Sequence, residues 1–199
     1  MFDLDPRPVT LEGQHARLEP LSHDHLAGLA RVGLDPEIWD LNPRNITSQA
    51  DLQAYVDDAV ADAEHGITLP FAIVGKDAGH AIGSTRFGNI DRRNRRLEIG
   101  WTWLGRKWWR TGVNTEVKSL LLTHAFEDLG CARVELKTDT LNRRSRDAIL
   151  RLGAIEEGVL RKHIRTDSGR WRDTAYYSIL DDEWPHVKER LEAMQKRYE

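Results

Sequence analysis

The sequence predicts a mixed α/β fold in which a central, mostly antiparallel sheet is flanked by helices. Segments with an apolar period of two alternate with segments whose apolar residues recur every three or four positions, as in strands and amphipathic helices. A strand–helix–strand unit over residues 95–139 implies one right-handed crossover between parallel strands. With 199 residues, 40% of them apolar, the chain is expected to form a single domain over residues 1–199.

The N-terminal half is predicted to supply four strands, two helices, and a helical turn or loop between those helices. Ser48 is followed three residues later by Asp51 and then by an apolar stripe, which is typical of a capped amphipathic helix. Two segments that alternate with a period of two flank a turn at residues 77–79, which is typical of a hairpin. In order, we expect a strand at 16–21, a short helix capped by Ser22, a helical turn within 36–43, a helix from Ser48 to Gly66, and strands at 69–75, 80–90 and 95–104.

The strand at residues 95–104 has a clear alternation, and successive side chains of a strand point to opposite faces. Its apolar face is expected to carry Leu97, Ile99, Trp101 and Trp103, and its other face Glu98, Gly100 and Thr102. We therefore expect Glu98 to point away from the apolar face.

The C-terminal half returns to alternating helices and strands. Gly130 and Gly153 each follow an amphipathic stretch, as helix-ending glycines do, and Asn142 is a typical N-cap. In order, we expect a helix at 112–130, a strand at 133–139, a helix from Asn142 to Gly153, strands near 154–165 and 171–180 joined by a turn at 167–169, and a last helix with Asp182 as its cap and Pro185 in its first turn.

Composition excludes several classes of protein. The formal charge of −3 argues against a dedicated nucleic-acid binder. We expect neither a signal peptide nor a membrane span, because the start lacks an apolar segment and no apolar run is long enough. The single cysteine, Cys131, favours a reducing cytoplasm and has two interpretations, a buried small side chain or a nucleophile. The histidines lack the spacing of a metal site, so we expect no metal.

The loop between Trp103 and Glu116 is the best candidate for a ligand site. It joins a strand to a helix, and the free amides of a helix N-terminus bind anions. Gly112 would allow close backbone approach. Between Arg92 and Arg110 there are seven basic residues and one acidic one. Two interpretations remain open from the pattern alone: a phosphate-binding site or a solvated charged loop. Neither the P-loop pattern nor the dinucleotide-binding pattern is present.

Three motifs, taken in order, resemble those of the GNAT acetyltransferases, in the branch that acetylates the N-termini of ribosomal proteins. Residues 109–114 (WRTGVN), followed by Thr115 and Glu116, resemble the pyrophosphate-binding motif, with Arg110 and Asn114 at positions where a small residue is usual. Residues 142–145 (NRRS) and the following 150–161 resemble the family's next helix and strand. Residues 11–20 resemble its first strand. The resemblance covers nearly the whole chain.

This resemblance implies a three-layer fold whose sheet splays after the fourth strand. Acetyl-CoA is then expected to insert into the opening like an additional strand, and the reaction is expected to need no metal. The implied cofactor-binding residues are Trp103, Leu104, Trp109, Arg110, Thr111, Gly112, Val113, Asn114, Thr115, Asn142 and Arg146. Cations at the start of a helix oppose its dipole, and an anion of coenzyme A would relieve that conflict at Arg143, Arg144 and Arg146. Solvent exposure of these arginines is the alternative.

The implied reaction is direct acetyl transfer to a primary amine, which needs a base for the amine proton and a proton for the thiolate. Glu98 is the candidate base, and the alternatives are an ordinary surface residue of the strand or a salt bridge with a nearby arginine. Ser145 is the candidate acid on the motif, and its alternative is an ordinary serine in the first turn of a helix. Tyr177 or Tyr176 is the candidate on a late strand, and the alternative for either tyrosine is core packing with a satisfied hydroxyl.

Two rival functions remain open at this stage: transfer of another acyl group, such as succinyl, and a non-catalytic acyl-CoA-binding module. The acceptor, which could be a protein N-terminus or a small-molecule amine, is not readable from the sequence. Its contacts are expected from residues around 30–65 and from the last hairpin. The resemblance is compatible with a homodimer.

Overall fold

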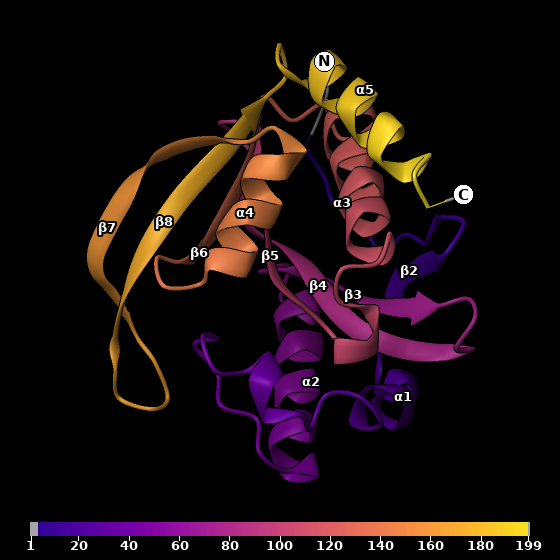
Figure 1. The fold of residues 1–199 in the computed structure, drawn as a ribbon, viewed down its shortest axis with the longest axis vertical. Helices are drawn as coiled ribbons and strands as arrows, with labels where there is room; N and C mark the ends of the chain where they lie inside the picture. Colours follow the sequence, from indigo (N-terminus) through magenta and orange to yellow (C-terminus); the bar gives the residue numbers. More distant parts are fainter. Residues whose placement is uncertain (1–3, 199) are drawn as a thin grey trace.

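The computed structural model describes residues 4–198, and in this part of the chain one eight-stranded sheet lies between two layers of helices (Figure 1). The strand order is β1-β2-β3-β4-β5-β6-β8-β7. The pair β5–β6 is parallel and the remaining pairs are antiparallel. The predicted mixed, mostly antiparallel sheet is therefore confirmed, including the crossover over residues 95–139.

The elements follow the predicted order, with one short strand added at the start. The strands are β1 (Leu11–Glu12), β2 (Ala16–Pro20), β3 (Leu69–Gly75), β4 (His80–Asp91), β5 (Arg96–Leu104), β6 (Arg133–Asp139), β7 (Ile155–Arg165) and β8 (Trp171–Leu180). The α-helices are α1 (Leu26–Ala30), α2 (Gln49–Glu64), α3 (Val113–Thr123), α4 (Arg143–Leu152) and α5 (Trp184–Gln195). A π-helical turn, His124–Asp128, continues α3, and 3₁₀ turns lie at His23–His25, Pro36–Ile38 and Arg106–Trp108.

Helix ends follow local side-chain chemistry, which is why most of their positions could be predicted. The Ser48 hydroxyl accepts from the backbone N–H of Asp51 (3.1 Å), and the Asp51 carboxylate accepts from the N–H of Ser48 (2.9 Å), as in a capping box. Gly153 ends α4 with a φ of 110°. The predicted cap of the last helix was wrong: the cap of α5 is Glu183 instead of Asp182, and the Glu183 carboxylate accepts from the N–H of Leu180.

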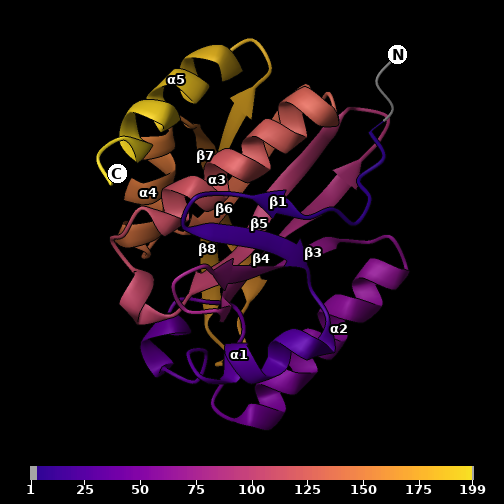
Figure 2. The ribbon, with the colours of Figure 1, turned by 90° about the vertical axis from the view of Figure 1, so that its right-hand side faces the viewer.

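Two apolar cores lie on opposite faces of the sheet, as the views along two axes show (Figures 1 and 2). The larger core packs α3, α4 and α5 against the sheet through side chains such as Leu121, Leu152 and Leu191. The smaller core packs α1 and α2 through Leu29, Tyr55 and others. Both faces of the sheet are thus packed, which fixes the positions of the central strands β5 and β6.

Strands β5 and β6 pair over three positions and then separate. Their register runs from Arg96 opposite Arg133 to Glu98 opposite Glu135. Beyond this point β5 continues to Leu104 and β6 to Asp139 without pairing with each other. The facing backbone groups of both strands are therefore open to another hydrogen-bonding chain. The predicted splay after the fourth strand, which is β5 once the short β1 is counted, matches this geometry.

A β-bulge in β5 overturns the predicted alternation of that strand. The β4–β5 register shifts between Ser84 and Arg86, and Trp101 takes a φ of +52°. An extra residue moves the following side chains to the other face. Leu97 and Ile99 therefore pack in the larger core, whereas Trp103 packs in the smaller core. Trp101 is 39% exposed and belongs to neither.

Candidate active site

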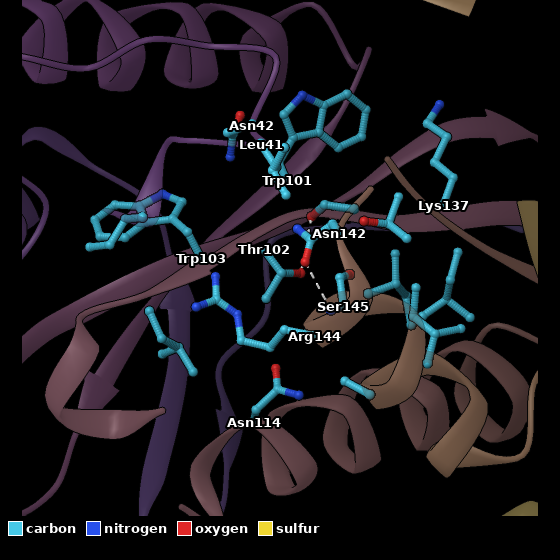
Figure 3. Close-up of a pocket in the computed structure, with 18 of the residues that line it drawn as sticks. Leu41, Asn42, Trp101, Thr102, Trp103, Asn114, Lys137, Asn142, Arg144 and Ser145 are labelled. Atoms are coloured by element: carbon cyan, nitrogen blue, oxygen red, sulfur yellow. Dashed lines mark hydrogen bonds between the residues drawn. The ribbon is translucent and has the colours of Figure 1, made fainter. Parts of the chain in front are cut away.

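A cavity of about 1080 Å³ opens where β5 and β6 separate (Figure 3). Its walls come from β5 and β6, from the loop that leads to α3, from the N-terminal part of α3, and from α4 along its length. Residues 38–44 and the ends of the β7–β8 hairpin, from Ile164 to Arg172, close the other end. These last two segments are those expected to contact an acceptor, and both line the cavity.

The loop after β5 reaches the start of α3 through a backbone conformation that is unusual for a residue other than glycine. Arg110 has a φ of +60°, a region that glycine adopts most easily. The preceding Trp109 donates its indole N–H to the carbonyl of Leu104 (2.8 Å), and the Arg144 guanidinium lies 3.5 Å from the centre of its ring. Asn114, in the first turn of α3, faces the same cavity (Figure 3). Free amides and cations thus meet at one end.

The start of α4 contributes the second polar wall. The Asn142 side chain accepts from the backbone N–H of Ser145 (3.0 Å), which confirms the predicted cap and leaves the Ser145 hydroxyl free of that role (Figure 3). Arg143 and Arg144 line the cavity. The guanidinium of Arg146 instead donates to the hydroxyl of Tyr177 (3.0 Å) and to Glu156 (3.1 Å). Arg146 therefore does not line the cavity, whereas Arg143 and Arg144 do.

Glu98 lies at the point where the two strands separate, and its side chain is 2% exposed. One oxygen, Oε2, accepts from the amide of Asn89 (2.5 Å) and pairs with the ammonium of Lys137 (2.7 Å). The other oxygen, Oε1, lies over Gly100, where a Cβ atom would approach it to 2.6 Å. Within residues 4–198 Oε1 makes no hydrogen bond, so it is free to accept a proton.

Lys118 is a further titratable group in this cavity. The ammonium donates to the hydroxyl of Thr102 (2.8 Å), beside the bulge of β5. Burial lowers the pKa of Lys118 to about 7, and the charge of Glu98 opposes this shift. The charge of Lys118 therefore changes near neutral pH.

The structure brings most of the predicted site residues together. Two candidate catalytic residues, Glu98 and Ser145, line the cavity, and so do seven of the predicted cofactor residues: Trp103, Leu104, Trp109, Arg110, Thr111, Asn114 and Asn142. The side chains of Val113 and Thr115 are buried beneath, and Gly112 lies under the ring of Tyr198. Glu116 accepts from the backbone N–H groups of Gln14, His15 and Ala16, so it anchors the N-terminal strands.

Tyr177 does not face the cavity. Its side chain is fully buried in the larger core, and burial raises the pKa of its hydroxyl, which accepts from Arg146. Tyr176 lies on the other face of β8 and is also outside the lining. Cys131 is buried, and burial raises the pKa of its thiol to about 12, which favours the interpretation as a buried small side chain.

Sequence reasoning missed three basic residues of the cavity that lie near Glu98: Lys118, Lys137 and Arg172. A signal was present for Lys118, which is four residues after Asn114 and so on the same side of α3. Another was present for Lys137, which alternates with the apolar residues of β6. Their approach to Glu98 depends on strand register and helix packing, which the sequence does not show.

The described residues also yield two negative findings. Between residues 4 and 198, no helix has both the length and the apolar character that crossing a bilayer requires. In the same residues, no three or more histidine, cysteine, aspartate or glutamate side chains form a group that could hold a metal ion.

Comparison with known proteins places this geometry in a family. Residues 15–155 match the model of the acetyltransferase (GNAT) domain. The chain is 29% identical over 179 residues to p20, an uncharacterized N-acetyltransferase of Bacillus licheniformis, and the match covers 88% of this chain and 98% of p20. It is 25% identical over 122 residues to the ribosomal protein uS5-alanine N-acetyltransferase of Escherichia coli, covering 61% and 62% of the two chains.

A solved structure agrees with these relatives. The chain superimposes on RimJ of Mycobacterium smegmatis, solved in complex with CoA-disulfide, with a TM-score of 0.78 and 25% identity over 94% of this chain and 95% of that one. The predicted resemblance to the ribosomal-protein branch is confirmed by these names, and the predicted fold by this superposition. The match over residues 15–155 shows that the chain belongs to the GNAT acetyltransferase family.

Proposed function

We propose that this protein transfers an acetyl group from acetyl-CoA directly to a primary amine of a peptide or a small molecule. The observation that carries the proposal is the position of Glu98 and its free Oε1, at the apex of the opening between β5 and β6. The opening has unpaired strand edges on both sides and a cationic end at α3. The relatives' names, which include an alanine N-acetyltransferase and a CoA complex, support the same activity.

The cavity offers binding groups for two parts of coenzyme A, the pyrophosphate and the pantetheine arm. The amides at the start of α3, with Arg110 and Arg144, offer donors and charge to the pyrophosphate. The open backbone of β5 after Glu98 offers hydrogen bonds to the amides of the pantetheine arm, which would extend the sheet as a strand does. This arrangement directs the thioester toward the apex.

The chemistry requires two proton movements. The amine nitrogen attacks the thioester carbonyl, forming the C–N bond, and the C–S bond then breaks to release the thiolate. Glu98 Oε1 accepts the proton that the amine loses, directly or through water. The Ser145 hydroxyl, on the opposite wall of the cavity, donates a hydrogen bond or proton to the leaving sulfur. At no step is the acetyl group bonded covalently to the enzyme.

Coenzyme A is expected to stabilise the protein against heat. A ligand that binds only the folded state adds about 2.7 kcal/mol to the free energy of unfolding at 100 times its Kd. The measurement is the melting temperature with increasing coenzyme A, with adenosine as the control that lacks the pyrophosphate and pantetheine. A melting temperature that saturating coenzyme A or acetyl-CoA leaves unchanged would contradict the proposed function.

Gly112→Asp is expected to weaken coenzyme A binding at least about tenfold, because two like charges a few ångströms apart repel by more than the ~1.4 kcal/mol that a tenfold change requires. A Cβ atom at Gly112 would also lie 2.9 Å from the ring of Tyr198, so that ring must move. Tyr198→Ala is the matched control, since it removes the ring without adding charge. Affinity by calorimetry that is equal in folded Gly112→Asp and in the parent would place the pyrophosphate elsewhere.

A further inference from the structure

Cations outnumber acids around the candidate base. Glu98 is paired with Lys137, and Lys118 reaches the same cavity from α3. Arg172, on β8, lines the cavity as well, and the charge of Glu98 acts on its pKa. Glu98 is therefore surrounded by three basic side chains, Lys137, Arg172 and Lys118, and the charge of Lys118 changes near neutral pH. Such a site repels a simple ammonium ion, although it must admit an amine.

Of these three basic residues, Arg172 alone has no partner among the described side chains. Its residue is 6% exposed, and its guanidinium makes no hydrogen bond or ion pair within residues 4–198, where its Nε atom is buried and unsatisfied. Burial lowers its pKa, which measures the cost of removing this charge from water. The charge of the nearby Asp139 partly opposes this shift, but Asp139 makes no hydrogen bond or ion pair with Arg172, because its carboxylate pairs with Arg170 and accepts from the N–H of Leu141. Buried charges are normally paired, so Arg172 indicates a position for an anion.

The strand pattern places this position on the acceptor side of the sheet. Arg172, Thr174 and Tyr176 alternate with Ala175 and Tyr177, which face the larger core. Tyr176 is opposite Lys137 in the register of β6 and β8. The face that carries Arg172 is thus the face of Lys137, next to Glu98, and lies away from α4 and the cofactor arginines there.

The acceptor end is also enclosed. The backbone N–H of Asp167, in the β7–β8 turn, donates to the carbonyl of Pro43 (2.9 Å), and its carboxylate accepts from the N–H of Asn45 (3.1 Å). These bonds tie the hairpin to the segment that leads into α2. Arg172 therefore lies at an end of the cavity whose two bordering segments are held together.

We propose that the acceptor is a primary amine that carries a carboxylate close to its nitrogen, an α-amino acid being the simplest case, and that Arg172 binds that carboxylate. This inference rests on the proposed acetyl transfer. The carboxylate neutralises the excess cation and accepts the fork of guanidinium donors. The neighbouring cations at the same time favour the neutral, nucleophilic form of the amine, which then lies within reach of Glu98.

The test compares each standard α-amino acid with its α-amide as acceptor, measured by thiol release from acetyl-CoA. We expect at least one amino acid to exceed its amide about tenfold or more in kcat/KM, mainly through KM. Arg172→Gln should abolish this preference, so that the amino acid and its amide give similar kcat/KM values. Arg172→Lys should keep part of it, since it keeps charge but loses the fork. Arg161→Gln, at an exposed arginine of β7, is the matched control and should keep all of it.

The outcomes separate this inference from the proposed function. If coenzyme A binds by calorimetry but no amino acid exceeds its amide, the inference is overturned and the acetyl-CoA site stands. A preference that persists in folded Arg172→Gln overturns the assignment of Arg172. Failure of coenzyme A to bind the parent protein overturns the proposed function itself.

Discussion

Glu98→Gln is expected to lower kcat at neutral pH by about 100-fold or more, with the affinity for acetyl-CoA nearly unchanged. Gln has the same shape and can still accept from Asn89, but it lacks the basicity needed to take the amine proton. Because Lys137 loses its ion pair, part of the loss could come from a shifted Lys137. The pH–rate profile distinguishes the two: loss of a base is partly rescued at high pH, where more of the acceptor is already neutral.

Glu135→Gln is the matched control for this variant. Glu135 lies directly opposite Glu98 in the parallel register and is also buried, but it pairs with Arg96 and Arg133 and is outside the cavity lining. It should retain most of the activity. Profiles of Glu98→Gln and of the parent that coincide in height and shape would make Glu98 a structural residue.

Ser145→Ala is expected to reduce turnover by roughly 10²–10⁴-fold if its hydroxyl assists the thiolate. The helix cap should survive, because it uses the backbone N–H of Ser145 and not its hydroxyl. Thermal unfolding and coenzyme A affinity should therefore change little, while kcat falls. The loss should shrink with an acyl donor whose leaving thiol is more acidic, since that thiolate needs less assistance.

Tyr177→Phe is the matched control, since it removes one hydroxyl from the neighbouring core. Its hydroxyl accepts from Arg146 and lies outside the cavity lining, so turnover should stay near the parent value. The opposite result, with Tyr177→Phe inactive and Ser145→Ala active, would exchange the two roles. Near-normal rates in both would mean that the thiolate leaves without either group.

The loop between β5 and α3 shows how much a sequence motif can predict. The pattern WRTGVN correctly located the loop that lines the cavity, and the positive φ of Arg110 explains why a small residue is usual there. The same pattern did not distinguish side chains that face the cavity from those beneath it. Thr115 and Val113 are buried because α3 packs its inner side on the sheet. Which side of α3 is inner depends on the crossover from β5 to β6.

The start of α4 shows a second limit of prediction from sequence, because adjacent residues there point in different directions. Ser145 and Arg146 are adjacent in the sequence, yet one faces the cavity and the other bonds to Tyr177 in the opposite direction. Residues one apart on a helix point about 100° away from each other. The choice between them is made by the rotation of α4 about its axis, which its packing against the sheet determines.

The sequence by itself determined the order and nearly all the boundaries of the elements, the caps Ser48 and Asn142, the family, and the candidates Glu98 and Ser145. These properties are local, because periodicity, capping and motif spacing involve residues a few positions apart. Only the tertiary structure decided the bulge at Trp101, the exact point (Glu98) at which the predicted separation of β5 from β6 begins, and the meeting of Lys118, Lys137 and Arg172 around that carboxylate. Strand register and burial bring these distant residues together, and a charge acquires its pairing and its pKa only in that assembled surrounding.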